Sequence, residues 1–437
     1  MHAESRQPNI LSPGHRLRAQ YESARALCRN PHPSPCPLST MILTSLPNET
    51  IDHIFRLTGR PGAYGHLGAA TQVCKRLAAI GQPILLHDIT VRVCSDDPLE
   101  PSSVLSYHAD FVSRNPGIAV LVHKLTILGF TRHSPLDGYY EIKDISAVEL
   151  AKLCTRERMP NLTSLTISLA NISSSVNAST LTPLSFSHIR DLYLYDVRLH
   201  DDDTTALSSS LPLFTNLTSL HIAPSAFFNP SLEQLINLRR STVSTQSLAI
   251  TDVSQTHTHF VESLVIAAKG RLKSLEIGLE AEPSTTVAKD PLPATPNLSH
   301  AHLSTSLTLA LPLRDCQGHK LLASRLARRC RDTLTRAPPH TQSITLVLDC
   351  RNNDAHSLTE LVAHFPLRNV HDTIANQVPE AQHVSYVLRR WISADPPLTW
   401  DAVIEMNTAW SPKILCERGS YSLRYRDDPD PRHNEEY

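Results

Sequence analysis

The stretch F-T-N-L-T-S-L-H-I-A, residues 214–223, places Leu217, Leu220 and Ile222 in the pattern L-x-x-L-x-I. Apolar residues that alternate with polar ones predict a short β-strand, with Leu220 and Ile222 on its buried face. Four further decapeptides follow the pattern closely: M-P-N-L-T-S-L-T-I-S (159–168), F-S-H-I-R-D-L-Y-L-Y (186–195), G-R-L-K-S-L-E-I-G-L (270–279) and T-P-N-L-S-H-A-H-L-S (295–304). The sequence therefore predicts a strand that is repeated along the chain.

The repeats return at nearly constant spacing, with steps of 27, 28, 28, 27 and 26 residues between their central apolar positions. These central positions are Leu165, Leu192, Leu220, Leu248, Leu275 and Ala301. Similar strands are predicted earlier, at Leu125 and Ile127, and later, at Ile344 and Leu346. A period of this length is typical of leucine-rich repeats, in which each unit pairs a short strand with a helix.

The segments between the strands have the composition of helices that could cover the apolar strand faces. They are D-D-T-T-A-L-S-S-S-L (202–211), N-P-S-L-E-Q-L-I-N-L-R-R (229–240), H-T-H-F-V-E-S-L-V-I-A-A-K-G (257–270) and G-H-K-L-L-A-S-R-L-A-R-R-C-R-D-T-L-T-R (318–336). No such unit can bury its apolar face alone, so the units must stack. We expect an α/β fold, a leucine-rich-repeat solenoid over residues 118–420. Doubly wound and barrel α/β folds remain alternatives, but constant spacing favours the solenoid.

Residues 41–92 precede the repeats and have the pattern of a small all-α domain. In L-P-N-E-T-I-D-H-I-F (46–55), Pro47 suits the first turn of a helix, and Glu49 places negative charge near the positive end of the helix dipole. The stretch H-L-G-A-A-T-Q-V-C-K-R-L-A-A-I (66–80) predicts a second amphipathic helix. Pro83 then precedes I-L-L-H-D-I-T-V (84–91), which we expect to be a short apolar exit.

The two ends of the chain differ in composition from the middle. Residues 1–40 are rich in proline and arginine, and we expect a disordered leader, with a transit peptide as the alternative and Met41 as a possible true start. Residues 93–117 are expected to be a connector. Residues 421–437 contain several acids and prolines, so we expect a disordered acidic tail.

The bulk composition favours a protein that binds neither nucleic acid nor membrane. The formal net charge is -1 over 437 residues, which gives no general attraction to a polyanion. No apolar run reaches the roughly 20 residues that cross a bilayer. The nine cysteines include no C-x-x-C pair, so reduced thiols are expected. With no apolar signal peptide, the sequons at Asn161 and Asn216 are expected to be unmodified, and we expect a soluble protein of the cytoplasm or nucleus, or both.

No pattern of a catalytic or cofactor site is found. The 13 glycines form no phosphate-binding loop, and neither a G-x-S-x-G elbow nor an H-E-x-x-H helix occurs. His257 and His259 could hold a metal, but two ligands favour ordinary surface histidines. The acidic run 201–203 is better explained as a helix N-terminus than as a cation site. We therefore expect no enzyme, no cofactor and no metal.

Two polar surfaces are candidates for contact with a partner. The helix at 318–336 carries Arg325, Arg328, Arg329 and Arg331, which suit a phosphorylated or acidic surface, although a solvated helix face is the favoured interpretation. The second surface consists of the residues between the buried positions of the strands. These form a mixed polar stripe, which we expect to be the substrate face: Thr166, Tyr193, His221, Ala249, Glu276 and His302.

The helical unit resembles the F-box. Its first part has Leu46-Pro47, Glu49, Ile51, Ile54 and Phe55, and its second part has Val73-Cys74-Lys75-Arg76-Leu77 before the apolar stretch 84–89. The loop 59–65 is longer than in the F-box pattern, and Leu77 stands where an aromatic residue is common. Together with the repeats, the chain resembles an F-box protein with C-terminal leucine-rich repeats.

This resemblance implies a substrate-recognition adaptor of a cullin-RING ubiquitin ligase of the SCF type. The F-box would bind a Skp-type adaptor, and the repeats would bind a protein substrate. Carried over by position, the residues that contact the adaptor or form the helical core are Leu46, Pro47, Ile51, Ile54, Phe55, Val73, Cys74 and Leu77. The alternative is a free-standing repeat scaffold for protein interactions, in which these helices only cap the first repeat.

Overall fold

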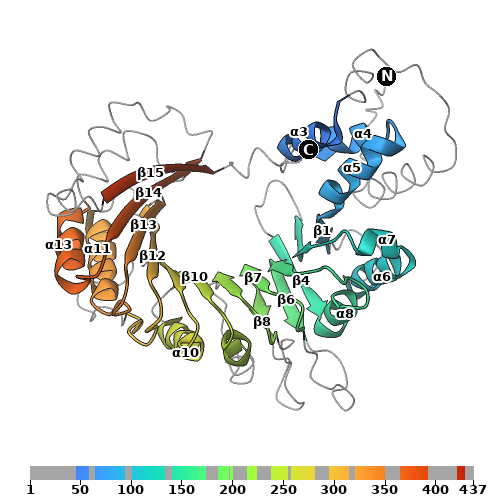
Figure 1. Cartoon of the computed structure of the whole chain (residues 1–437). Helices are drawn as coiled ribbons and strands as arrows, with labels where there is room; N and C mark the ends of the chain where they lie inside the picture. The colour runs from blue at the N-terminus through green and yellow to red at the C-terminus, as the bar shows by residue number, and fades with distance from the viewer. Residues whose placement is uncertain are drawn as a thin grey trace, which may run out of the picture. The chain divides into compact units, whose positions relative to one another are not determined.

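Figure 1 shows the computed structural model of the chain, which describes residues 46–58, 64–93, 101–132, 140–173, 186–195, 197–199, 214–223, 238–253, 257–280, 295–313, 320–349, 365–391 and 421–428. These residues form an α/β protein in which parallel strands alternate with helices, an arrangement compatible with a solenoid. The chain divides between Ser173 and Ser174 into two compact units, each with its own strands and helices.

The first elements in the described part of the first unit are three helices, α3 (Asn48–Thr58), α4 (Tyr64–Thr71) and α5 (Lys75–Leu86). The amide of Ile51 donates to the carbonyl oxygen of Pro47 at 3.1 Å, which closes the first turn of α3. Glu49 lies in this first turn, where its charge suits the helix dipole. The helix predicted from the stretch 46–55 is therefore confirmed.

The second helix, expected over 66–80, is instead two helices, because α4 ends at Thr71 and α5 begins at Lys75. Helix α5 also replaces the expected short exit, since it continues through Pro83 to Leu86. Residues Asp88–Arg92, expected to close the all-helical unit, instead form strand β1, which pairs in parallel with β2. The alternation in D-I-T-V-R explains the strand, since Val91 is buried while its neighbours Thr90 and Arg92 are exposed. The repeating strands therefore begin earlier than residue 118.

The rest of the first unit continues the alternation of helices and strands. Its elements are α6 (Pro101–Arg114), α7 (Pro116–Ala119), β2 (Lys124–Leu128), β3 (Phe130–Arg132), β4 (Tyr140–Ser146), α8 (Ala147–Leu153), β5 (Ser164–Ser168) and β6 (Ala170–Ser173). The parallel strands are hydrogen-bonded in the order β1-β2-β5, whereas β4 pairs with β3 antiparallel and with β6 in parallel. Helix α6 lies within the range predicted to be a connector.

The second unit consists of parallel strands joined by longer connections, several of them helical. Its elements are β7 (Asp191–Tyr195), β8 (Arg198–Leu199), β9 (Ser219–Ala223), β10 (Ser247–Val253), α10 (Thr258–Ala268), β11 (Ser274–Leu279), β12 (Ser306–Leu311), α11 (Lys320–Leu334), β13 (Ser343–Asp349), α13 (Leu367–Gln377), β14 (His383–Trp391) and β15 (Tyr421–Asp428). Its main sheet has the order β7-β9-β10-β11-β12-β13-β14-β15. Strand β15 occupies the start of the range 421–437, where a disordered tail was expected.

The register of this sheet aligns one buried apolar residue from each strand. Leu192, Leu220, Leu248 and Leu275 are successive partners, as the repeat pattern predicts. The prediction for the next strand is wrong, because Leu275 pairs with Leu307 and not with Ala301. Ala301 is buried in the turn before β12, whose own alternation is S-L-T-L-A-L.

Backbone hydrogen bonds between neighbouring repeats follow one pattern. The carbonyl oxygen of Thr218, just before β9, accepts the amides of Gln246 and Ser247 at 2.9 and 3.0 Å. The residue before each of several further strands accepts two amides from the next repeat in the same way: Arg190, Gln246, Lys273, Thr305 and Gln342. Polar side chains reinforce these steps, as when Asn216 donates to the carbonyl oxygen of Ser187 at 2.9 Å.

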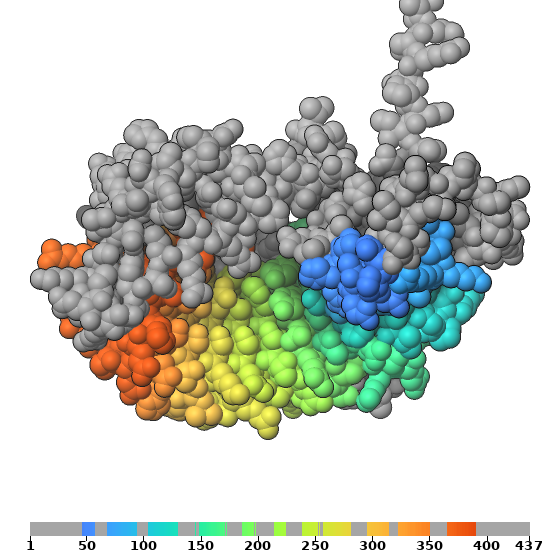
Figure 2. Space-filling view, turned by 45° about the horizontal axis from the view of Figure 1, so that its top comes forward, coloured from blue at the N-terminus to red at the C-terminus, as the bar shows by residue number. Residues whose placement is uncertain are grey.

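Helices α10, α11 and α13 lie on the same side of the strands of the second unit (Figure 1). Figure 2 shows the colours of this unit following one another in chain order from green to orange, as stacking of successive repeats requires. In α11, Leu322, Leu326 and Cys330 are buried, which confirms the predicted steps of four residues. The apolar strand residues on this side form the core with the helices.

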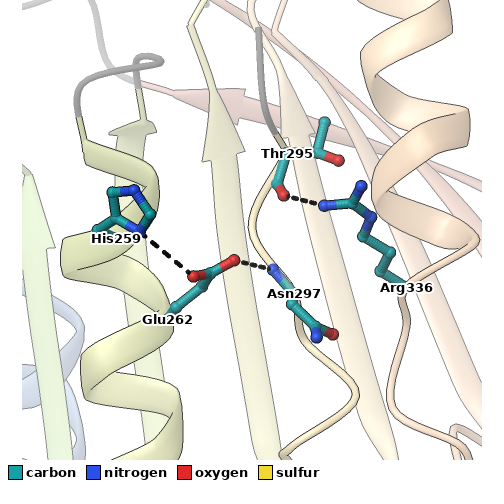
Figure 3. A network of polar contacts seen from close by, with 5 residues as sticks. All are labelled: His259, Glu262, Thr295, Asn297 and Arg336. Atoms are coloured by element: carbon teal, nitrogen blue, oxygen red, sulfur yellow. Dashed lines mark hydrogen bonds and ion pairs between the residues drawn. The ribbon is translucent and has the colours of Figure 1, made fainter.

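Polar contacts fix the segment 295–299 between α10 and the end of α11 (Figure 3). Glu262 on α10 accepts the backbone amide of Asn297 at 2.8 Å. Arg336 donates to the carbonyl oxygen of Thr295 at 2.6 Å. These contacts hold the turn that leads to β12, where the repeat spacing is longer than predicted. The helix predicted at 202–211, most of that at 229–240 and the leader at 1–40 lie outside the described residues.

Candidate functional site

The three N-terminal helices enclose a small core. Ile51 and Phe55 on α3 and Leu77 on α5 are buried, with exposed fractions of 0%, 2% and 0%. Partly buried apolar residues pack around them: Leu46, Ile54, Ala70, Cys74, Ile80, Ile84 and Leu85. Burial of Ile51, Phe55 and Leu77 stabilises the unit by roughly 1.5–3 kcal/mol for each side chain.

Helix α5 approaches the other two helices closely at Gly81. A Cβ atom at this position would overlap the side chain of Thr71 and touch the ring of Phe55 at 3.0 Å. Glycine is therefore required here by the packing of α5 against α3 and α4 and not by an unusual backbone angle. The sequence pattern of the second helix did not reveal this requirement.

Arg76 connects the start of α3 to the start of α5. Its Nη2 atom donates to the carbonyl oxygen of Leu46 at 2.7 Å, and its Nε atom donates to Oδ1 of Asn48 at 2.8 Å. Leu46 and Cys74 both pack against the same helical core. Arg76 therefore holds the start of α3, which follows Leu46 and Pro47, to the start of α5, which follows Val73 and Cys74.

Eight residues were predicted to contact the adaptor or to form the helical core, and the structure divides them into two groups. Ile51, Phe55 and Leu77 are enclosed in the core and cannot contact a partner directly. The others reach the surface in different degrees: Pro47 and Val73 are exposed, while Leu46, Ile54 and Cys74 are half-buried. At 39% exposure, Val73 is among the most exposed large apolar residues of the described chain.

In the second unit, the residues between the buried positions of the strands form a row on the opposite face of the sheet. Tyr193 pairs with His221, His221 with Ala249, and Ala249 with Glu276. Glu276 pairs with Thr308, so Thr308 occupies the place predicted for His302. His302 lies in a turn and is not part of the row. Thr166 holds the equivalent position on β5 of the first unit.

Three aromatic rings, those of Tyr193, Tyr195 and His221, gather on this face, and we call them the ring cluster. The ring centroids of Tyr195 and His221 are 5.1 Å apart, and those of Tyr193 and His221 are 5.9 Å apart. The Tyr195 hydroxyl lies 3.4 Å from Nδ1 of His221. The Nε2 atom of His221 is buried and has no hydrogen-bond partner within the described part of the chain.

Charged residues on other strands of the sheet shift the pKa values of His221 and Tyr195. Burial, followed by the positive charge of Arg389 on β14, lowers the pKa of His221. Burial has the largest effect in raising the pKa of the Tyr195 hydroxyl. Tyr193 and Glu276 raise it further, and Arg389 lowers it. At neutral pH His221 is therefore neutral and Tyr195 is protonated. Tyr195 and Arg389 were absent from the predicted stripe, although the alternation of F-S-H-I-R-D-L-Y-L-Y places Tyr195 on the same face as Tyr193.

The arginine-rich face of α11 is smaller than the sequence indicated. Arg329, expected on the solvated face, is only 2% exposed. Its guanidinium donates to the carbonyl oxygens of Glu280 at 2.7 Å and Val253 at 3.2 Å. Arg329 therefore ties α11 to the ends of β10 and β11.

No group of three or more metal-binding side chains is found among the described residues. His257 is buried, whereas the side chain of His259 is 99% exposed and lies 3.6 Å from Glu262. The two histidines thus have different surroundings. In the described part of the chain, every helix is too short or too polar to cross a membrane.

No model of a known protein family matches the chain, and a search of the curated proteins finds no significant match. The residues and their geometry therefore carry the functional argument.

Proposed function

We propose that this protein is a non-catalytic substrate receptor of a cullin-RING ubiquitin ligase in the cytoplasm or nucleus. Helices α3–α5 form an F-box that binds a Skp-type adaptor, and the leucine-rich repeats bind a protein substrate. Holding the substrate on the same assembly makes transfer of ubiquitin to it effectively intramolecular.

The observation that carries this proposal is the pair of hydrogen bonds by which Arg76 on α5 holds Leu46 and Asn48 at the start of α3. Pro47 and Val73, which precede these two helices, are exposed, and Leu46 and Cys74 are half-buried against the same core. Exposed apolar residues are typical of the core of an interface. This arrangement supports a surface to which both halves of the F-box pattern contribute.

The test is a pull-down of purified Skp-type adaptor with the full-length chain. We expect the wild-type chain to bind and Val73→Asp to lose more than about tenfold in affinity, because a charge would be buried in an apolar contact. Val120→Asp is the matched control, since Val120 is 42% exposed but follows α7, outside helices α3–α5. Equal binding by both variants, or no binding by the wild type, would exclude the proposal.

The second candidate is a free-standing repeat scaffold in which helices α3–α5 cap the first strand. It is supported by the short connection between helix and strand, since only His87 separates α5 from β1. In that case Leu46→Ala with Pro47→Ala would lower the melting temperature of the repeats, while the adaptor would bind neither variant nor wild type. For the ligase receptor we expect the opposite: weaker adaptor binding and unchanged melting of the repeats.

A further inference from the structure

The row of sheet-face residues in the second unit is chemically uneven. Ala249, Thr308 and Thr345 present small side chains, whereas Tyr193 and His221 present rings. Among the described residues of the row, the end at β7 and β9 therefore combines aromatic surface with hydrogen-bonding groups. Tyrosine side chains supply large contact areas at low conformational cost and are common at binding hot spots.

His221 has a hydrogen-bonding atom that the folded chain does not satisfy. We assign the Tyr195 hydroxyl as the donor to Nδ1 of His221, 3.4 Å away, which puts the ring proton on Nε2 and makes Nε2 a donor. Nε2 is buried and lacks a partner within the described residues. An unsatisfied buried donor costs about 1–3 kcal/mol, so a ligand that brings an acceptor would remove this cost.

The surrounding charges indicate the kind of acceptor. Arg389 lies four residues after Ser385, the register partner of Thr345, so it stands on the same face of the sheet as the row. Its positive charge lowers the pKa of both Tyr195 and His221. An anionic acceptor is therefore favoured over a neutral carbonyl. The negative charge of Glu276 raises the pKa of Tyr195, which Arg389 lowers. A carboxylate carries a single negative charge, which matches the single positive charge of Arg389, and phosphate is kept as an outcome of the test.

We propose that the ring cluster, together with Arg389, binds an aspartate or glutamate side chain in an extended segment of a partner protein. The carboxylate accepts a hydrogen bond from Nε2 of His221, and the tyrosine rings pack against the adjacent residues of the segment. Because Nε2 is buried in the free protein, the neighbouring rings must move to admit the ligand. This inference rests on the proposal that the repeats bind a protein substrate, and it names the chemistry of that substrate.

The test begins with a phage-displayed library of random peptides selected on the full-length chain. We expect selected peptides to be enriched in aspartate or glutamate. Replacing that acid by its amide should weaken binding about tenfold or more, measured by fluorescence polarisation, because hydrogen bonds to charged groups contribute about 1.5–3 kcal/mol. This change leaves the protein itself untouched.

Variants of the protein complete the experiment. His221→Gln and Arg389→Gln should each weaken binding of the selected peptide by about tenfold, with thermal melting as the check on folding. His302→Ala is the matched control, because His302 lies in an exposed turn outside the row, and its binding should be unchanged. If Arg389→Gln does not fold, His221→Gln and the amide peptide still decide the question.

Three results would overturn the inference: no enrichment of acids or no selected peptide, equal affinity for the acid and amide peptides, or unchanged binding by His221→Gln. Tighter binding of the same peptide with phosphoserine in place of the acid would overturn the choice of a carboxylate. None of these measurements uses the ligase adaptor. Failure of the peptide site and failure of adaptor binding are therefore separate outcomes.

Discussion

The Nη2 atom of Arg76 donates a hydrogen bond to the carbonyl oxygen of Leu46 at 2.7 Å, across a separation of 30 positions in the sequence. Leu46 belongs to the first half of the F-box pattern and Arg76 to the second. A side chain that is often regarded as a solvated charge thus joins the two halves. The relationship makes Arg76 a positioning residue for the exposed apolar surface at this end of the helices.

Replacing Arg76 by alanine should weaken adaptor binding by roughly threefold to tenfold, because a hydrogen bond of about 1 kcal/mol no longer holds Leu46 and Pro47 in place. The measurement is a titration of adaptor against the full-length chain. Arg56→Ala is the control: Arg56 donates to Asp52 at 2.7 Å within α3 and touches neither half of the surface. A loss of equal size in both variants would show that general charge, and not positioning, is responsible.

Replacing Arg329 by alanine should lower the free energy of unfolding by about 3 kcal/mol. The change removes the donors to the carbonyl oxygens of Glu280 and Val253 and leaves a cavity beside β10 and β11. Arg328→Ala, at the neighbouring exposed position of α11, should change stability by less than about 0.5 kcal/mol. Urea denaturation measures both, and similar values for the two variants would contradict the role of Arg329.

Stability should fall in mild acid because of His371. Its ring is 7% exposed and meets Tyr386 edge-on, with centroids 5.4 Å apart, and burial lowers the pKa of His371 to about 4. The unfolded chain, with the ordinary value of 6.5, binds a proton first, so stability is full above pH 6.5 and is lost as the pH falls toward 4. The loss should approach roughly 3 kcal/mol.

The variant His371→Gln should lose less stability than the wild type between pH 6.5 and 4, as measured by urea denaturation at each pH. His340→Gln provides the control, because the side chain of His340 is 63% exposed. Parallel pH curves for wild type and His371→Gln would refute the assignment to this histidine.

Two cysteines should resist alkylation in the native protein. Cys154 and Cys330 are fully enclosed, and burial raises the pKa of each thiol to about 12. The thiolate is the form that reacts with iodoacetamide. With a pKa of about 12, only about one thiol in a hundred thousand would be ionised at pH 7, even if iodoacetamide reached it. Of the three cysteines that the structure describes, half-buried Cys74 should be modified first. Peptide mapping by mass spectrometry measures this, and denatured protein, in which every thiol is modified, is the control.

The strand positions Leu165, Leu192, Leu220, Leu248 and Leu275 could be predicted because their spacing is nearly constant and each is buried on one face. The same reasoning failed at the next repeat. Leu307 lies 32 residues after Leu275, whereas Ala301 lies only 26 after it. The backbone decides the register there, since Lys273 accepts the amides of Thr305 and Ser306. A period in the sequence cannot reveal such an insertion.

The candidate sites were predicted only in part, for similar physical reasons. The apolar pattern placed Ile51, Phe55 and Leu77 together but could not separate core from surface. Steps of four residues along α11 identified its apolar side, yet Arg329 lies at the boundary, where long side chains can bury their stems and find carbonyl groups. Arg389 acts on His221 only because β14 and β9 belong to one sheet, which no local pattern indicates.

The paired amides that each repeat donates to one carbonyl of the repeat before it also determine how the chain would respond to force. Each such junction, as at Thr218 with Gln246 and Ser247, is a separate mechanical bond in series with the next. Pulled from its C-terminal end, the second unit should therefore give way one repeat at a time. The repeats of 27 or 28 residues between β7 and β11 would each release about 90–100 Å of extended chain, and the longer ones after β12 would release more. An unfoldase drawing on this end would meet a succession of small barriers in place of one large one.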